Sequence, residues 1–278
     1  MAGVIPGRVS VVIPTRNSAA TLKTLLESVR GQTYEDVETI VVDNGSSDDT
    51  QSIAGALADA VLTRGPERSA QRNFGVEHAT GEFVLVLDSD MVLEPGVIEA
   101  CVLRQRETGA SALVVPERTV GDGWLARVRA LERSCYVGDE SVEAARFFTV
   151  DAFRRYDGYD TEFTGVEDWD LPARMRDGGE VTDRIVGPFI DHDESDIRLG
   201  AHLRKKFYYA QTALPYLRRH KRLASRQVVL LRPAFARHSG RLARSPFLTA
   251  GLVALKLAEG AAGVAGVAVA LRRPPRRS

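Results

Sequence analysis

Two aspartates, Asp88 and Asp90, follow directly on five consecutive apolar residues, Phe83 to Leu87. A run of that length, rich in Val and Leu, is typical of a strand buried on both faces of a parallel sheet. Open α/β sheets bind their ligands at the carboxyl ends of such strands, so the pair marks a candidate ligand site. Paired acids there suit a divalent cation that holds phosphates. Taken alone, Asp88-Ser89-Asp90 fits an ordinary polar turn equally well.

The elements that would position these acids follow from the apolar pattern. Strands are predicted at Val9–Pro14, Val37–Asp43, Ala60–Thr63, Phe83–Asp90 and Ser111–Pro116. Helices are predicted from Asn17 or Ser18 to Arg30, from the Asn44–Asp49 turn to Ala58, at Arg68–Ala79 and from Pro95 to Gly109. This alternation predicts an α/β fold with a mostly parallel sheet built from βαβ units over residues 8–116. Residues 117–198 are less regular and are expected to complete the domain as an α+β half.

The charge of the chain is divided unevenly. Residues 1–197 hold 19 Lys and Arg against 36 Asp and Glu, whereas residues 198–278 hold 18 Lys and Arg and one acid, Glu259. Basic tails bind nucleic acid or anionic membrane surfaces. Because this tail also contains a long apolar stretch, the sequence favours a membrane and no nucleic acid.

The tail itself is predicted to be helical. Apolar residues from Leu199 to about Leu214 follow a helical stripe, which Pro215 is expected to kink or end. Pro246–Leu271 is long enough to cross a bilayer, but Lys256 and Glu259 would each cost about 2.5–3.5 kcal/mol at its centre. An interfacial helix or a shallow re-entrant hairpin therefore fits better than a span. The remaining alternative is that the segment packs on the catalytic domain or forms a dimer contact.

The setting predicted for the chain is the cytoplasm, at the inner face of the cell membrane. Cys101 and Cys135 show no metal-ligand or redox spacing, which favours reduced thiols. The first residues lack the basic and long apolar segments of a secretory signal.

Five motifs in order carry a resemblance to a known family. They are Pro14-Thr15-Arg16-Asn17, Asp43-Asn44-Gly45-Ser46-Ser47-Asp48, Arg72-Asn73, Asp88-Ser89-Asp90 and Gly165-Val166-Glu167-Asp168-Trp169-Asp170-Leu171. Together the motifs resemble the family-2 glycosyltransferases of GT-A fold, over about residues 8–195. The resemblance implies a nucleoside-diphosphate sugar as donor and a hydroxyl acceptor, which can be lipid-linked. It also implies a catalytic domain at 1–198, with the tail at 199–278 as an appendage.

Six residues are expected to bind the nucleotide-sugar: Pro14, Thr15, Asp43, Arg72, Asp88 and Asp90. The resemblance implies that Asp43 accepts hydrogen bonds from a nucleobase N–H, and that Pro14 and Thr15 line the pocket. Arg72 can neutralise Asp43 or a diphosphate, because guanidinium binds such groups bidentately.

Three residues are expected at the metal. Asp88 and Asp90 match the family's D-x-D motif, in which the outer acid, Asp90, binds Mn²⁺ or Mg²⁺ directly. Asp88 is expected to face the ribose or a metal-bound water. His192 lies where a late histidine completes the metal site in several members of the family, although a lone histidine is more often structural.

The acceptor side is expected at Glu167 and Asp168, which match the family's acidic pair. Inverting sugar transfer needs one general base, which is assigned to Asp168, with Glu167 as an acceptor-binding or substitute base. Trp169 is either a platform for a sugar ring or a core residue. Asp170 and Arg174, at i and i+4, are expected to form an ordinary intrahelical ion pair.

Three other functions fit the sequence less well. A sugar-phosphate nucleotidyltransferase would need a glycine-rich and basic loop after the first strand, and a dinucleotide-dependent dehydrogenase would need G-x-G-x-x-G there. Neither pattern is present. A non-catalytic membrane-binding relative is disfavoured by the intact Asp88, Asp90 and Asp168.

Overall fold

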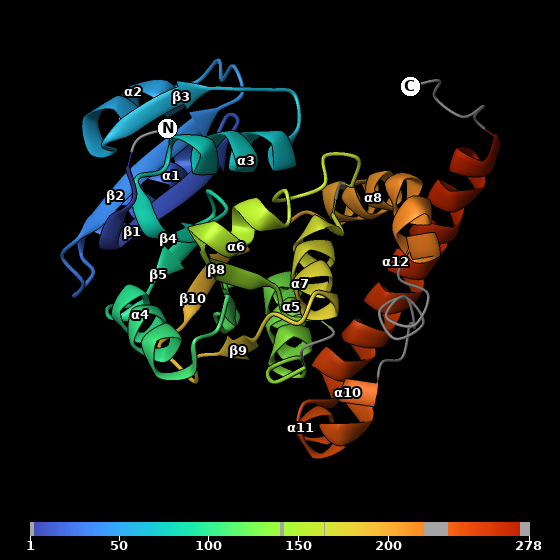
Figure 1. The fold of residues 1–278 in the computed structure, drawn as a ribbon. Helices are drawn as coiled ribbons and strands as arrows, with labels where there is room; N and C mark the ends of the chain where they lie inside the picture. Colours follow the sequence, from blue (N-terminus) through green and yellow to red (C-terminus); the bar gives the residue numbers. More distant parts are fainter. Residues whose placement is uncertain (1–2, 140–141, 164, 220–232, 273–278) are drawn as a thin grey trace. The chain divides into compact units, whose positions relative to one another are not determined.

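The computed structural model describes residues 3–139, 142–163, 165–219 and 233–272 (Figure 1). It forms two compact units that interleave along the sequence. The first unit comprises Met1–Arg118, Ala144–Thr161 and Glu167–Asp193, and the second comprises Thr119–Glu143, Glu162–Val166 and Glu194–Ser278, each within the described residues. A functional boundary at residue 198 stays a prediction.

The first unit is built on a seven-stranded sheet with the order β3-β2-β1-β4-β8-β6-β9. Its strands are β1 Ile5–Thr15, β2 Val37–Asp43, β3 Ala60–Thr63, β4 Gly81–Val86, β6 Ala112–Val114, β8 Ala145–Thr149 and β9 Thr182–Arg184. Neighbouring strands are parallel except that β8 runs antiparallel to both β4 and β6. A smaller sheet has the order β5-β10-β7, with β5 at Met91–Leu93, β10 at Ile190–Asp193 and β7 at Glu117–Val120. The mixed α/β fold with a mostly parallel sheet is therefore confirmed.

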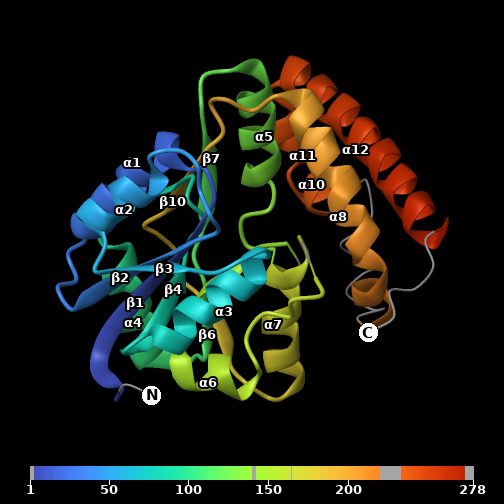
Figure 2. The ribbon, with the colours of Figure 1, turned by 90° about the horizontal axis from the view of Figure 1, so that it is seen from above.

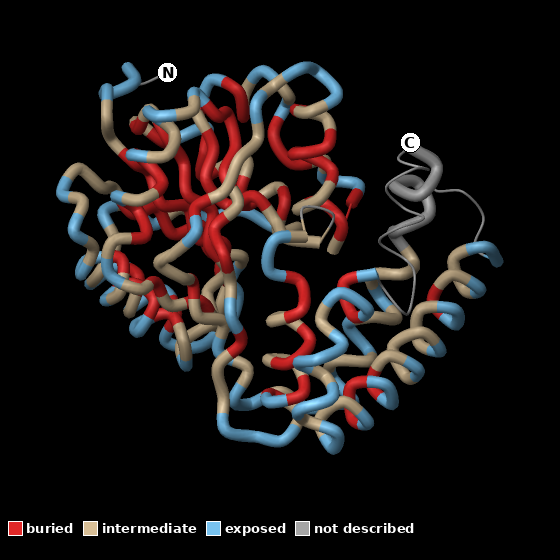
Figure 3. The backbone as a smooth tube through the Cα atoms, turned by 90° about the horizontal axis from the view of Figure 1, so that it is seen from below, coloured by how far each residue is buried: buried red, intermediate tan, exposed pale blue. Residues whose placement is uncertain are grey.

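Helices cover both faces of the large sheet (Figure 2). They are α1 Ala19–Arg30, α2 Thr50–Leu57, α3 Arg68–His78, α4 Val97–Thr108, α6 Val150–Arg155 and α7 Glu167–Asp177. Alternate residues of β1 serve the two faces: Val11 packs with α1, α2 and α4, whereas Val12 packs with α3, α6 and α7. The central strands are consequently buried on both faces, as Figure 3 shows in red, and read as continuous apolar runs.

Helix α3 lies unusually close to the sheet. A Cβ atom on Gly75 would come within 2.4 Å of Cγ1 of Val12 and 3.1 Å of Cγ2 of Val42. Only glycine fits at this point of α3 without moving the helix or the strands.

The second unit is helical. Its helices are α5 Trp124–Ser134, α8 Leu199–Arg219, α10 Pro233–Arg237, α11 Ser239–Ala243 and α12 Pro246–Arg272. Helix α8 continues through Pro215 to Arg219, so of the two predicted effects of this proline an end of the helix is wrong, and a kink stays a prediction. Helix α12 is one continuous helix, not a re-entrant hairpin, and by length and composition it could cross a membrane.

The predicted elements of the first half match the structure closely. β2 has the predicted bounds, and α1 ends at Arg30 as expected. The Phe83–Asp90 strand is shorter than predicted: β4 ends at Val86, and the chain turns so that Met91 N donates to Asp88 O at 3.1 Å. The two aspartates thus lie on a polar turn at the sheet edge, which combines the two alternatives that the sequence left open.

Candidate functional site

The residues expected to bind the nucleotide lie where β1 and β2 end together. Thr15, the last residue of β1, pairs in register with Asp43, the last residue of β2. The buried Gln71 of α3 donates to the carbonyl oxygens of Thr15 at 3.0 Å and of Val42 at 2.6 Å. These bonds fix α3 to the ends of both strands. Pro14 and Thr15 are buried there, beside Asp43.

Asp43 is fully buried and completely supplied with donors. Its Oδ1 accepts from the hydroxyls of Thr15 at 3.2 Å and Ser46 at 2.5 Å, and its Oδ2 accepts from Ser46 N at 2.9 Å and Gln51 Nε2 at 2.8 Å. Burial alone would raise the pKa of Asp43, but these hydrogen bonds hold the pKa below its ordinary value. A carboxylate has about four lone-pair sites. A nucleobase N–H can therefore contact Asp43 only by replacing one of these donors.

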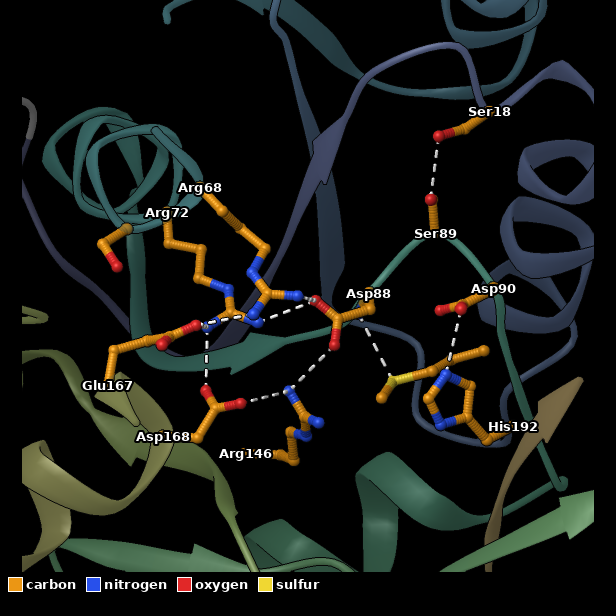
Figure 4. Close-up of polar contacts among 12 residues, drawn as sticks. Ser18, Arg68, Arg72, Asp88, Ser89, Asp90, Arg146, Glu167, Asp168 and His192 are labelled. Atoms are coloured by element: carbon orange, nitrogen blue, oxygen red, sulfur yellow. Dashed lines mark hydrogen bonds and ion pairs between the residues drawn. The ribbon is translucent and has the colours of Figure 1, made fainter. Parts of the chain in front are cut away.

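Arg72 joins the donor side of the site to the acceptor side (Figure 4). Its buried guanidinium donates through Nη2 to Asp88 Oδ1 at 2.7 Å and through Nη1 to Asp168 Oδ1 at 2.8 Å. Arg72 does not pair with Asp43, which was one of its two expected partners. Successive helix residues point about 100° apart, so Gln71 faces the ends of β1 and β2 while Arg72 faces α7.

Arg68 and Arg146 also reach this cluster, and the sequence interpretation missed both. Arg68 Nη2 donates to Glu167 Oε1 at 2.7 Å. Arg146, buried on β8, donates to Glu117 Oε1 at 2.9 Å and lies 3.5 Å from Asp88 Oδ2 through Nη1. The i, i+4 spacing of Arg68 and Arg72 was a usable signal for the first. No local signal marks the second, because antiparallel pairing with β4 brings it to the edge where β4 ends.

The cluster is strongly charged yet incompletely bonded. Burial opposes ionisation of Asp88, but Arg72, Arg68 and Arg146 hold its pKa well below the ordinary value. Buried Arg72 Nε, Arg146 Nη1 and Glu167 Oε2 have no hydrogen-bond partner among the described residues. Buried polar atoms are normally paired, so these three are exceptions within the cluster.

The two members of the acidic pair differ in access. Asp168 is 21% exposed, whereas the side chain of Glu167 is 1% exposed and lies against Arg68 and Arg72. Only Asp168 can therefore be reached by a substrate hydroxyl without rearrangement. Asp170 and Arg174 form the predicted intrahelical ion pair at 2.6 Å. Trp169 is half-buried.

Asp90 and His192 meet on the other side of the Asp88–Met91 turn. Antiparallel pairing of β5 with β10 places His192 opposite Met91, the residue after Asp90. His192 Nε2 lies 3.0 Å from Asp90 Oδ2, and Asp90 is 43% exposed. Asp88, which turns toward the arginines, does not join this pair (Figure 4).

The Asp90–His192 pair fits a divalent cation held jointly with substrate. A carboxylate oxygen of Asp90 and an imidazole nitrogen of His192, 3.0 Å apart, are both ligand types that Mn²⁺ accepts, and these two residues would hold the ion. Within the described residues there is no group of three or more His, Cys, Asp or Glu side chains arranged to hold a metal. Mg²⁺ and similar ions are commonly bound through one or two side chains plus substrate phosphates and water.

Sequence comparison gives matches over most of the chain. The family model described as Glycosyl transferase family 2 matches residues 10–165, a range that includes Asp43, Arg72, Asp88 and Asp90 and ends before Glu167. A pre-mycofactocin glycosyltransferase of Mycobacterium tuberculosis is 30% identical over 232 residues, which cover 76% of this chain and 48% of that protein. The chain thus spans about half the length of this relative. A GalNAc(5)-diNAcBac-PP-undecaprenol beta-1,3-glucosyltransferase of Campylobacter jejuni is 33% identical over 36% of this chain and 35% of its own length.

Solved structures share the fold. A mannosyltransferase of Pyrobaculum calidifontis, in complex with GDP-Man and Mn²⁺, superposes with a TM-score of 0.67 at 19% identity, covering 95% of this chain and 87% of its own. TarS of S. aureus, in complex with UDP-GlcNAc, superposes with a TM-score of 0.56 at 18% identity, covering 95% of this chain and 90% of its own. At these identities the likeness concerns the fold alone.

Proposed function

Since this chain belongs to glycosyltransferase family 2, we propose that it is an inverting, metal-dependent enzyme that transfers a sugar from a nucleoside-diphosphate sugar to a hydroxyl acceptor. One observation carries the proposal. Arg72 binds Asp88, beside the expected donor site, and Asp168, the accessible acid of the acceptor pair, with the same guanidinium. The groups needed at the two ends of the transfer therefore lie within reach of one another.

The residues of the donor site take distinct roles in this proposal. The strand ends at Thr15 and Asp43 form the nucleotide pocket, in which Asp43 fixes the Ser46 turn and gives up a hydroxyl donor when a base binds. Asp90 and His192 would hold Mn²⁺ or Mg²⁺. When bound, such an ion neutralises charge on the leaving diphosphate. Asp88 is engaged by three arginines, so its role is to position them and to face the ribose or a metal-bound water.

Asp168 is the proposed general base. A single base on the face opposite the leaving group is what an inverting displacement requires, and Asp168 is the exposed member of its pair. In the structure its oxygens face Arg72 and Arg146. These guanidiniums orient the carboxylate toward an incoming hydroxyl, while Glu167 holds Arg68 and Arg72 in place from behind.

The acceptor and the location belong to the same proposal. One relative carries in its name an undecaprenol-linked acceptor, and the basic, apolar tail suits an anionic membrane surface. We therefore propose a lipid-linked or cell-envelope glycan acceptor, and a peripheral position at the cytoplasmic face of the cell membrane.

The test is donor turnover by the purified full chain. A panel of uridine, guanosine and thymidine diphosphate sugars is incubated with Mn²⁺ or with EDTA, and released nucleoside diphosphate is measured. We expect one donor to be hydrolysed slowly with Mn²⁺, and not with EDTA or in Asp168→Asn. The exposed Asp49→Asn is the matched control. Release of pyrophosphate from a nucleoside triphosphate and a sugar phosphate would instead indicate a nucleotidyltransferase and contradict the proposal.

A further inference from the structure

Helix α12 exposes apolar residues and directs the charged residues of its middle toward the rest of the second unit. Before Arg272 on its last turn, its exposed large residues are all apolar and include Phe247, Leu257 and Val264, at 86%, 61% and 73% exposure. Val253 and Leu271 continue the same exposed surface, and the exposed residues between them are alanines. From Phe247 to Leu271 no exposed residue of α12 is charged or polar. Soluble surface helices show the opposite arrangement, with the polar face outward.

The two charged residues in the middle of α12, Lys256 and Glu259, point into the second unit. Lys256 pairs with Glu132 of α5 and, at 2.5 Å, with Glu259. Glu259 in turn pairs with His202 of α8 at 2.6 Å. Arg129 completes the network by pairing with Glu132 at 2.6 Å. All of these side chains are largely buried, so they fasten α12 to α5 and α8.

The packing of small residues reinforces this attachment. Gly251 lies against Trp124 and Val128 of α5, and Gly266 lies against the backbone of Phe207 on α8. An added Cβ would come within 2.4 Å and 2.3 Å of these neighbours. Figure 2 shows α8 and α12 side by side along much of their lengths. The face of α12 that meets its neighbours is therefore fixed, and the apolar face remains outside.

This attachment is incompatible with a lone membrane span. Lys256 and Glu259 lie near the middle of the 27-residue helix, so a span would place them at the bilayer centre. Their partners on α5 and α8 would have to enter to the same depth, together with Arg129 and the exposed Arg204 and Lys205. Charged residues at that depth are expensive. A helix lying along the interface keeps every one of these charges on the protein side.

The composition of the outer face favours lipid over a second copy of the chain. Helix pairs in water surround their apolar seam with charged residues that select the partner, and the exposed part of α12 has none over 25 residues. Arginines stand at both ends instead, at Arg241 and Arg244 before the helix and at Arg272 on its last turn. Basic residues flanking an apolar face match anionic head groups above acyl chains.

We propose that α12 lies in the plane of an anionic bilayer, with the face formed by Phe247, Val253, Leu257, Val264 and Leu271 in contact with acyl chains. This inference rests on the membrane location given under Proposed function and adds the orientation and the contact surface. The Glu132–Lys256–Glu259–His202 network holds the helix in that orientation. The chain is thereby attached to the membrane surface by a helix that does not cross the membrane.

The first experiment measures flotation of the full chain with vesicles. Vesicles of phosphatidylcholine alone are compared with vesicles containing one-quarter phosphatidylglycerol. We expect binding to the anionic vesicles and a loss of about tenfold or more in the double variant Leu257→Glu/Val264→Glu, since binding scales with buried apolar area. Val186→Glu is the control, because Val186 is an even more exposed valine outside α12. Wild-type protein that stays unbound, or a double variant that binds fully, overturns the proposal.

The second experiment measures depth. Cysteines introduced singly at Phe247, Leu257 and Leu271 are labelled with an environment-sensitive fluorophore and quenched by lipids that carry a quencher at known depth. Cys101 and Cys135 are buried and do not compete for label. Equal, shallow depths support the proposal, whereas a deep Leu257 between shallow ends indicates a span and overturns it. Sedimentation that shows a dimer broken by the double variant would assign the face to a second copy.

Donor binding is followed in the same samples by the melting temperature with nucleoside diphosphate and Mn²⁺. Wild-type protein that responds to a donor but does not bind the anionic vesicles contradicts only the proposed orientation of α12. Vesicle binding with no response to any donor contradicts the proposed function instead.

Discussion

Nε2 of His192 lies 3.0 Å from Oδ2 of Asp90, although the two residues belong to different sequence segments of the first unit. The antiparallel pairing of β5 and β10 creates this proximity. The proximity supports a shared role for the two side chains in holding a cation.

Removal of either side chain is expected to weaken metal binding. We predict that His192→Ala and Asp90→Asn each raise the Kd of Mn²⁺, measured calorimetrically in the presence of nucleoside diphosphate, by at least about tenfold, or about 1.4 kcal/mol. His78→Ala, on the exposed end of α3, is the control. An unchanged Kd in His192→Ala would show that His192 is structural.

The roles of Glu167 and Asp168 can be distinguished by kinetics. Asp168→Asn is predicted to lower kcat by about 10²- to 10⁴-fold, the range that general-base catalysis contributes, with little change in donor binding. Glu167→Gln is predicted to act mainly on stability, because it removes a buried partner of Arg68 and Arg72. Steady-state kinetics and urea unfolding of both variants check this. The reverse pattern would assign the base to Glu167.

Arg146 gives a prediction on both stability and turnover. Arg146→Met removes the buried guanidinium that pairs with Glu117 and lies 3.5 Å from Asp88, and we expect the free energy of unfolding to fall by about 3–5 kcal/mol. The exposed Arg155→Met should cost no more than about 1 kcal/mol.

Arg146→Lys keeps the charge but loses the planar fork. We expect this variant to retain most of the stability and to lose turnover, because Nη1 of Arg146 also faces Asp168. Full activity in Arg146→Lys would restrict Arg146 to a structural role.

The buried network of the second unit predicts an acid-sensitive stability. Burial alone would raise the pKa of Glu132, but Arg129 and Lys256 outweigh burial and lower the pKa from 4.5 to about 2. A carboxyl whose pKa is depressed by folding stabilises the folded state above the unfolded value, and this stabilisation is lost as the pH falls. We therefore expect the free energy of unfolding to decrease between about pH 5 and pH 2.

The measurement is urea unfolding at several pH values, followed by fluorescence of Trp124 in the same unit. Glu132→Gln should be less stable at pH 7 and show a shallower decline toward acid. Glu107→Gln, an exposed residue of α4, should behave as the wild type. An equally steep decline in Glu132→Gln would assign the acid sensitivity to other groups.

The buried parallel strands were predictable because their whole environment is apolar. Helices pack on both faces of β1, β2 and β4, so the buried parts of these strands are rich in Val, Leu and Ile. Such runs can be recognised in the sequence without knowing which strands pair with them. The polar residues that end these runs, such as Thr15 and Asp43, were predictable for the same reason. Their neighbours in space are set by parallel register alone.

The parts of the fold and of the candidate site that were not predicted depend on contacts between residues distant in the sequence. The β8 segment Ala145–Thr149 contains a buried arginine, and its antiparallel direction cannot be read from its own residues. Arg146 was missed for that reason. The partners of Arg72 likewise depend on the packing of α7. This helix, distant from α3 in the sequence, brings Glu167 and Asp168 to Arg72.

Because Gly75 has no side chain, α3 lies close to the sheet. The height of α3 above the sheet sets the distance between the backbone of Arg72 and its partners. Gly75 lets α3 rest directly on Val12 and Val42, and Arg72 lies one turn earlier on the same helix. An arginine side chain has a fixed maximum length, so its two simultaneous hydrogen bonds, to Asp88 and to Asp168, tolerate little change in the height of α3 above the sheet. A single methyl group added at position 75 would lift the helix and break this alignment without touching any residue of the proposed site. The spacing between donor and acceptor chemistry is thus set by backbone contact on the hidden side of α3.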